Sequence, residues 1–148
     1  MTHCFYGWQN SKNITAINST YGEKILHPAD LYDALLNVWC EYSCAPRMRV
    51  QWSESNITLG QCSITAFLAQ DIFGGQVFGT ETLDGDCHCF NFVDGLIFDL
   101  TSEQFNYDLT YKTDWEQFRA GHFENNHDKF LRYEYLKSQL LKNASRCF

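Results

Sequence analysis

Hydrophobic positions along this chain follow a helical spacing in three segments. They predict helices over residues 28–40, 62–72 and 126–142. Pro28 suits the first turn of a helix, so the first of these is expected to begin there. The segment 62–72 is apolar on nearly all sides, which indicates a central, buried helix, and the glycine pair 74–75 ends it.

Short apolar runs separated by turn residues follow the central helix. They predict strands over residues 76–80, 87–93 and 96–100, with turns at 83–86 and 94–95. Asp94-Gly95 between two apolar runs is a strong hairpin signal. Thr101 is expected to start a short helix with Gln104 as its capping-box partner, and a second short helix is expected over 114–119.

The remaining segments are polar or interrupted. Residues 1–24 are rich in Asn, Ser and Thr and predict an irregular N-terminal arm that packs over the domain, or a segment that includes a short helix. Residues 47–52 predict a short extended piece, and residues 53–60 a loop. The predicted order is helices first, then a helix that leads into antiparallel strands, then helices again. This order is typical of an α+β domain. With 148 residues and no repeat or linker, we expect a single domain over 1–148.

Charge and hydropathy narrow the range of partners. The formal net charge is -7 without a cluster of Lys and Arg, so we expect no nucleic acid partner. No apolar run reaches the length of a membrane span, so no membrane partner is expected. The first residues lack the basic and apolar regions of a secretory signal, which predicts a cytoplasmic location. The acidic balance favours a neutral or cationic substrate.

Seven cysteines, an odd count without a secretory signal, are expected to be free thiols. The run Cys87-His88-Cys89 is rich in potential metal ligands, but strand alternation sends His88 to one face and both cysteines to the other. Structural zinc sites use spaced pairs such as C-x₂-C, and the C-x₃-C spacing of Cys40 and Cys44 is only a weak half-site. We therefore expect no metal and no cofactor.

Cys62 stands where the central helix is expected to begin and is a candidate nucleophile. A free thiol is mostly protonated at neutral pH, and both a helix N-terminus and a nearby imidazole favour the thiolate. Gly60 beside it permits close approach of a substrate to the backbone. The alternative interpretation is a buried, inert cysteine, which is the commoner role of this residue type.

The predicted hairpin brings a histidine and a carboxylate together. With a two-residue turn at Asp94-Gly95, Phe90 pairs with Asp99, and His88 becomes a diagonal neighbour of Asp99 on the same sheet face. The carboxylate can then hold one imidazole nitrogen and leave the other for a thiol. A three-residue loop would put the two side chains on opposite faces. The alternatives are a strand-end capping Asp99 and a structural His88.

An acyl-transfer site also needs donors for an oxyanion. The backbone N–H of Cys62 is one candidate. Candidate side chains for oxyanion or substrate binding are Gln61, Asn56, Ser53 and Trp52. A turn-forming Asn56 and a helix-capping Ser53 are equally compatible with the sequence. The other histidines have no thiol or carboxylate context that indicates a role and are expected at the surface; they are His3, His27, His122 and His127.

The spaced residues of this region resemble the YunG-like proteins, a small bacterial family of unknown function. The resemblance covers about residues 29–106 and is carried by Trp52-Ser53, Gly60-Gln61-Cys62, Thr65-Ala66, Gln70-Asp71, Phe73-Gly74-Gly75, His88, Asn91, Asp94-Gly95, Asp99-Leu100-Thr101 and Gln104-Phe105. Cys89 and Phe90, beside the histidine, depart from the family pattern in detail.

The order Cys, His, Asp also resembles the transglutaminase-like and arylamine N-acetyltransferase branch of the papain-like fold. There a helix carries the Cys, and two neighbouring strands carry the His and the Asp. The resemblance implies an α+β, papain-like (transglutaminase-like) fold with a central Cys-bearing helix on a small antiparallel sheet. It implies Cys62 as nucleophile, His88 as general base and acid, and Asp99 as the residue that orients His88.

The implied function is that of a thiol-dependent hydrolase or acyltransferase. Its substrate would be an amide, thioester or ester in a peptide, a protein or a small acyl compound. The alternative is a catalytically inactive papain-like scaffold that acts as a protein-binding module, which the 16% aromatic content favours because interfaces are rich in aromatic residues. The sequence leaves the identity of the substrate and the oligomeric state open.

Overall fold

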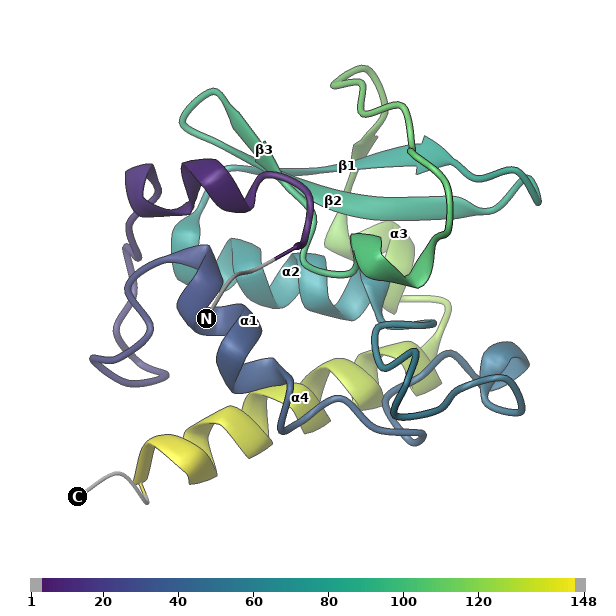
Figure 1. The fold of residues 1–148 in the computed structure, drawn as a ribbon. Coiled ribbons are helices and arrows are strands. Elements are labelled where there is room, and N and C mark those ends of the chain that lie inside the picture. Colours follow the sequence, from purple (N-terminus) through teal and green to yellow (C-terminus); the bar gives the residue numbers. More distant parts are fainter. Residues whose placement is uncertain (1–3, 146–148) are drawn as a thin grey trace.

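Helix α2 (Cys62–Phe73) lies between a β-sheet and the long helix α4 (His127–Ser145) in the computed structural model, which describes residues 4–145 (Figure 1). Eight of the twelve residues of α2 are buried, as its apolar sequence predicts. Gly74 and Gly75 follow with φ angles of 78° and 71°, which end the helix. The prediction of a central, buried helix is confirmed.

Four antiparallel strands form the sheet, in the order β3-β2-β1-β4. They are β1 (Gln76–Glu81), β2 (Cys87–Val93), β3 (Leu96–Phe98) and β4 (Glu116–Gln117). The sequence predicts the first three, but the helix that it predicts over 114–119 is wrong. Strand β4 pairs there with the edge of β1, and Gly79 N donates to Trp115 O at 2.8 Å. Helix α3 (Arg119–Phe123) begins only after this strand.

The hairpin between β2 and β3 has the predicted register. Val93 pairs with Leu96, and both residues of the turn Asp94-Gly95 have positive φ, as a two-residue type I′ turn requires. Because every pair in this register follows from the turn, His88 and Asp99 face the same side of the sheet.

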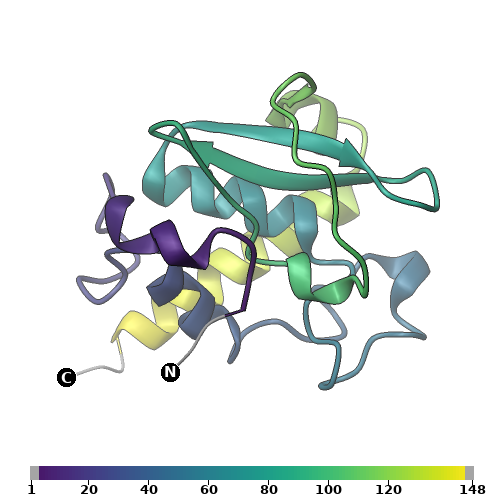
Figure 2. The same cartoon turned by 45° about the horizontal axis from the view of Figure 1, so that its top comes forward.

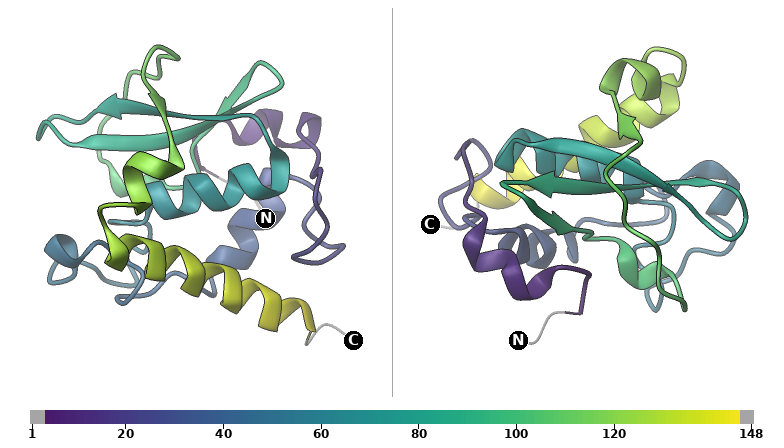
Figure 3. Two further views of the ribbon diagram at one scale, coloured as in Figure 1. Left: turned by 180° about the vertical axis from the view of Figure 1, so that it is seen from behind. Right: turned by 90° about the horizontal axis from the view of Figure 1, so that it is seen from above.

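The two faces of β2 have different surroundings. On one face, the Asn91 side chain donates to Ala66 O of α2 at 2.8 Å, and Cys89 joins the hydrophobic core. On the other face, His88 and Phe90 contact aromatic rings from the segment 105–111. This segment continues across the outer face of the sheet (Figures 2 and 3). The sheet is therefore covered on both sides near the start of β2.

Two predicted elements before α2 take other forms. Helix α1 (Pro28–Leu35) ends five residues before the predicted position. The amides of Asn37 and Val38 bond to the carbonyl groups three residues earlier, Ala34 O and Leu35 O, and close the chain into tighter turns. Residues 47–52, predicted as extended, begin within the 3₁₀ helix η2 (Pro46–Met48) and continue in turns.

The N-terminal segment is part of the core. Phe5 and Ile14 are fully buried on either side of the 3₁₀ helix η1 (Trp8–Asn13). Tyr6 forms an antiparallel bridge with Asp99, in which Asp99 N donates to Tyr6 O at 2.9 Å. Tyr6 N in turn donates to the hydroxyl of Ser102, at the start of the 3₁₀ helix η3 (Ser102–Gln104), at 2.8 Å. From residue 4 on, the N-terminal arm therefore packs against the domain and includes a short helix, which agrees with both expectations.

Helix α4 covers the face of α2 that points away from the sheet (Figure 1). Its buried side carries Tyr133, Leu136 and Leu140. Phe130 and Leu141, which the sequence groups with them, are about two-fifths exposed. Between residues 4 and 145, no helix combines the length and the apolar character needed to cross a membrane.

Candidate active site

Asp99 is a buried carboxylate with four hydrogen-bond donors. Its Oδ1 accepts from the amide and the hydroxyl of Thr101, at 3.1 and 3.2 Å. Its Oδ2 accepts from the Tyr111 hydroxyl at 2.7 Å and binds His88 Nε2 at 2.6 Å. Only 1% of Asp99 is exposed. Because both oxygens are held, the carboxylate has a fixed orientation toward the imidazole.

His88 is held between Asp99 and an aromatic ring. Phe105 packs edge-on against the imidazole, with ring centroids 4.8 Å apart. Burial lowers the His88 pKa, but the charge and hydrogen bond of Asp99, together with Cys62, outweigh it and raise the pKa well above its ordinary value. Since Nε2 is engaged by Asp99, Nδ1 is the nitrogen left for the thiol.

Cys62 is the first residue of α2, and its thiol lies against the start of β2. It interacts with the thiol and the backbone amide of Cys89 and with the His88 imidazole. Hydrogen bonding from the Cys89 thiol, and the hydrogen bond and charge of His88, outweigh burial and hold the Cys62 pKa well below its ordinary value. The arrangement therefore favours a thiolate beside an imidazolium.

Three thiols form a row along this edge of the core. The Cys89 thiol interacts with those of both Cys62 and Cys87, and these hydrogen bonds, together with burial, raise the Cys89 pKa. Cys89 is therefore a protonated donor to its neighbours. The six cysteines from Cys4 to Cys89 are free thiols, while Cys147 lies outside the described residues. Over 4–145, no group of three or more His, Cys, Asp or Glu side chains is arranged to hold a metal ion.

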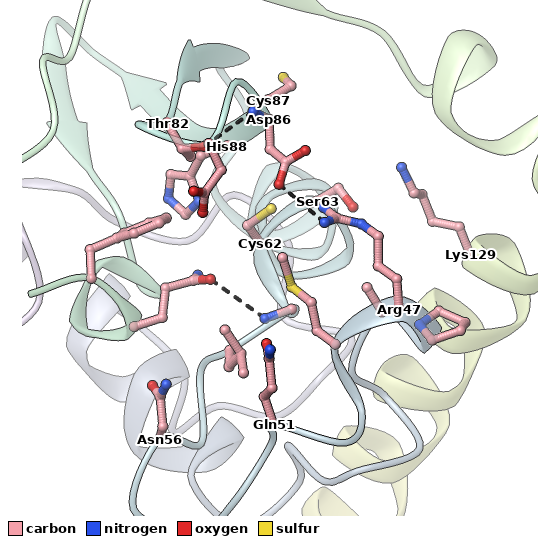
Figure 4. A pocket seen from close by; sticks show the side chains of 18 of the residues that line it. Arg47, Gln51, Asn56, Cys62, Ser63, Thr82, Asp86, Cys87, His88 and Lys129 are labelled. Carbon is pink, nitrogen blue, oxygen red and sulfur yellow. Dashed lines mark hydrogen bonds and ion pairs between the residues drawn. The ribbon is translucent and has the colours of Figure 1, made fainter.

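A cavity of about 800 Å³ opens above Cys62 (Figure 4). Its walls come from the loops before α2, the β1–β2 hairpin, residues 104–107 and the side of α3 and α4 that faces them. Cys62 and His88 both line it, so an electrophile in the cavity can reach the thiol. Phe105 and Tyr107 give one wall an aromatic surface.

Two backbone amides and one predicted side chain stand where an oxyanion or substrate can bind. Cys62 and Ser63 are the first two residues of α2, and first-turn amides of a helix have no acceptor within the helix. Asn56 lines the cavity, as its predicted role requires. The first turn of α2 and Asn56 are therefore the candidates for binding a carbonyl oxygen.

The side chain of Gln61 does not reach the cavity, which corrects its predicted role. Gln61 is fully buried, its Nε2 donates to Cys40 O at 3.1 Å, and its Oε1 has no hydrogen-bond partner among the described residues. The turn that ends with Gln61 N bonded to Thr58 O directs this side chain into the protein.

Ser53 and Trp52, also predicted to bind the oxyanion or the substrate, do not line the cavity. The Ser53 hydroxyl shares a hydrogen bond of 2.9 Å with that of Ser55. Trp52 Nε1 donates to Ile57 O at 2.9 Å. Both side chains are used to hold the loop 53–60 in shape.

Gln104 has a role that the sequence does not predict. Thr101 directs its hydroxyl to Asp99, so the predicted capping box does not form. Gln104 instead donates to Thr101 O at 2.9 Å and accepts from Gly60 N at 3.5 Å. It therefore connects the turn after Asp99 to the loop that leads into α2. Its helical spacing from Thr101 suggested only a local role.

His122 is a second residue that sequence reasoning missed. It is half-buried and lines the cavity, contrary to the expected surface position. His27, by contrast, binds Ile14 O at 2.8 Å, and His3 lies outside the described residues. No motif in the sequence links His122 to Cys62, which is sixty residues earlier, so its place at the site follows only from the fold.

Comparison of the sequence with known protein families identifies one that matches most of the chain. The sequence profile described as YunG protein matches residues 27–145, well over half of the chain. The chain belongs to the YunG family. The match extends beyond the expected region 29–106 to include α3 and α4, which contribute to the cavity.

One curated protein aligns with part of this chain. The uncharacterized protein YunG of Bacillus subtilis (strain 168) is 40% identical over 62 residues. The alignment covers 42% of this chain and 53% of that protein, so it spans about half the length of the relative. No solved structure matches this chain.

Proposed function

We propose that Cys62, His88 and Asp99 are the catalytic triad of a thiol-dependent hydrolase or acyltransferase. The observation that carries the proposal is the 2.6 Å contact between His88 Nε2 and Asp99 Oδ2, made by two side chains that are almost completely buried. The imidazole also interacts with a thiol that faces a cavity. A base oriented by a third group next to a nucleophile is the arrangement that covalent catalysis requires.

The first half of the reaction forms an acyl-enzyme. The Cys62 thiolate attacks the carbonyl carbon of an amide, thioester or ester, and the electron pair of the C=O bond moves to the oxygen. The amides of Cys62 and Ser63 stabilise this oxyanion. As the carbonyl re-forms, the bond to the leaving group breaks, and His88 Nδ1 gives its proton to the departing amine, thiol or alcohol.

The second half releases the acyl group. Water, for hydrolysis, or an amine, for transfer, loses a proton to His88 Nδ1 as it attacks the thioester carbon. The C–S bond then breaks and restores the thiolate. Asp99 keeps its proton-free form throughout and stabilises the imidazolium by orientation and charge.

The architecture supports the finer part of the proposal, a papain-like (transglutaminase-like) scaffold. The nucleophile begins a helix that packs on an antiparallel sheet, His88 lies on β2, and Asp99 directly follows the neighbouring strand β3. The free thiols of the described cysteines fit a reducing compartment, so a cytoplasmic location belongs to the same proposal.

A protein-binding module is the second candidate, and two apolar side chains favour it. Val50 and Leu83 are 97% and 80% exposed, and their chain neighbours Gln51 and Asp84 line the cavity. Apolar residues exposed beside a cavity are typical of a surface that a partner covers. In this case the buried pair of His88 and Asp99 would serve stability alone.

Acylation by p-nitrophenyl acetate separates the two candidates. An enzyme should release a burst of p-nitrophenolate at about pH 6 and carry the acetyl group on Cys62, located by peptide mass spectrometry. We expect His88→Gln to slow the burst by about 100-fold or more, the usual range for loss of a general base. Cys87→Ser, which removes another thiol of the cavity wall, should keep the burst. A burst that is unaffected by His88→Gln would favour the binding module.

A further inference from the structure

Lys129 differs from the other two cations that line the cavity. Arg47 pairs with Asp86 at 3.1 Å, and Arg132 pairs with Asp128 at 2.8 Å. For Lys129, no carboxylate of the described residues lies within ion-pair distance. Lys129 extends from α4 toward the cavity that contains Cys62 (Figure 4). Its positive charge therefore has no carboxylate partner among the residues that the structure describes.

A neutral histidine holds the Lys129 ammonium in place. Nζ lies 3.0 Å from His122 Nδ1, and His122 Nε2 lies 2.8 Å from Gln117 Oε1. An ammonium only donates and an amide oxygen only accepts, so His122 carries its hydrogen on Nε2 and accepts on Nδ1. Burial and the Lys129 charge both lower the His122 pKa. The pair thus carries a single positive charge, and Phe67 fixes the ring with an edge-on contact.

A second donor stands directly before α4. Asn126 lines the cavity, and its Oδ1 accepts from Lys129 N at 3.0 Å. The amide nitrogen of its side chain remains as a donor. The Lys129 charge also contributes to lowering the pKa of the Cys87 thiol. It therefore acts at the start of β2, against which the Cys62 thiol lies.

We propose that Lys129, His122 and Asn126 form an anion subsite that binds a carboxylate of the acyl substrate. This inference rests on the proposed function for the identity of the substrate. A single positive charge with one amide donor matches a carboxylate, which carries one charge, better than a phosphate dianion. The net charge of -7 favoured a neutral or cationic substrate, but charges beyond about 10 Å are largely screened in solution, so the local ammonium prevails.

Matched alkylating agents test the subsite. Iodoacetyl-glycine and iodoacetyl-β-alanine carry a carboxylate at two distances from the reactive carbon, and their carboxamides are neutral counterparts. We expect Cys62 to react about fivefold faster with the better carboxylate than with its carboxamide, the order expected for one partly screened charge pair. Lys129→Gln should abolish this preference, so that each carboxylate and its carboxamide react at equal rates. The exposed Lys112→Gln is the control and should keep the preference.

The outcomes for the two proposals are distinguishable. One outcome is that Cys62 reacts rapidly with the carboxamides near pH 6, but reacts no faster with either carboxylate in the wild type than in Lys129→Gln. The subsite is then overturned and the proposed function stands. If Cys62 reacts no faster than a free thiol, the proposed function fails. The subsite is then decided by NMR titration with N-acetylglycine and N-acetylglycinamide. A saturable shift of the His122 ring with the acid alone supports the subsite, and equal effects of the two compounds overturn it.

Discussion

The Tyr111 hydroxyl donates a 2.7 Å hydrogen bond to Asp99 Oδ2, the same oxygen that binds His88. Asp99 raises the Tyr111 pKa through its charge and this bond, after the larger effect of burial. The tyrosine therefore stays protonated and acts as a permanent donor. A residue from the segment that covers the sheet thus shares the carboxylate with the imidazole.

Tyr111→Phe should destabilise the protein because it removes a buried donor to a charged group and keeps the ring. We expect the free energy of unfolding, measured with urea, to fall by about 1.5–3 kcal/mol. Tyr107→Phe is the matched control, since its hydroxyl only accepts from Leu83 N in an exposed bond. Its effect should stay within about 0.5–1 kcal/mol. Equal losses of unfolding free energy in both variants would show that the bond to Asp99 stabilises the protein no more than the exposed bond of Tyr107.

The depressed Cys62 pKa predicts rapid alkylation in mildly acidic solution. The iodoacetamide rate at Cys62 should persist to a clearly lower pH than the rate of an ordinary thiol, whose pKa lies near 8.5. Asp99→Asn should raise the Cys62 pKa, because it weakens the imidazolium that stabilises the thiolate. Peptide mapping after timed labelling measures each rate. A Cys62 profile that follows the free thiol would contradict an activated nucleophile.

The two opposite pKa shifts also predict how stability depends on pH. A raised His88 pKa gives stability that is complete below about pH 6.5 and is lost as the pH rises through the folded pKa. A lowered Cys62 pKa gives stability that is present above about pH 8.5 and is lost as the pH falls through the folded pKa. Between about pH 6.5 and 8.5 the two slopes oppose each other, so the wild-type curve should be nearly flat.

Cys62→Ala leaves only the histidine slope in this window. Its free energy of unfolding should fall with rising pH, by at most about 1.4 kcal/mol per pH unit. Chemical denaturation at several pH values measures the curves, and Cys4→Ala at an exposed thiol controls for loss of a cysteine. Parallel curves for the wild type and Cys62→Ala would rule out a coupled thiolate and imidazolium.

Gly60 allows the loop before the nucleophile to pass close to its neighbours. Its φ is +71°, and an added Cβ would lie 2.6 Å from Cys44 Sγ and 2.9 Å from Ala45 N. Gly60→Ala should therefore destabilise the protein by about 2–4 kcal/mol, the sum of backbone strain and overpacking. Gly95→Ala is the control, because its φ is +80° but nothing lies within 4 Å of the added Cβ. Thermal unfolding should show a clearly smaller loss for the control.

The core of the candidate site is predictable because local signals determine it. Asp94-Gly95 fixes the turn, the turn fixes the register, and the register puts His88 beside Asp99. The start of the apolar helix likewise fixes the position of Cys62. These steps depend on residues that are close in the sequence, whereas the contact between Cys62 and His88 requires α2 to pack on the sheet.

The remaining features depend on contacts between distant segments. Strand β4 has two residues, and only the edge of β1 makes them a strand. Tyr111 and Lys129 reach the site because their segments pack against the sheet and α2, which no local pattern announces. The buried position of Gln61 depends on its bond to Cys40 O, formed across twenty-one residues. Tertiary packing, which a local pattern does not encode, decides these positions.

During synthesis, Tyr6 emerges from the ribosome more than ninety residues before Asp99, with which it pairs. Closing so long a loop is entropically unfavourable until the sheet and α2 have formed. A nascent chain that ends before Asp99 carries the Cys62 thiol without the carboxylate that orients His88. Under the proposed function, activation of Cys62 therefore waits until Asp99 has been synthesised and has paired with His88, and products truncated before Asp99 should show the reactivity of an ordinary thiol at this cysteine.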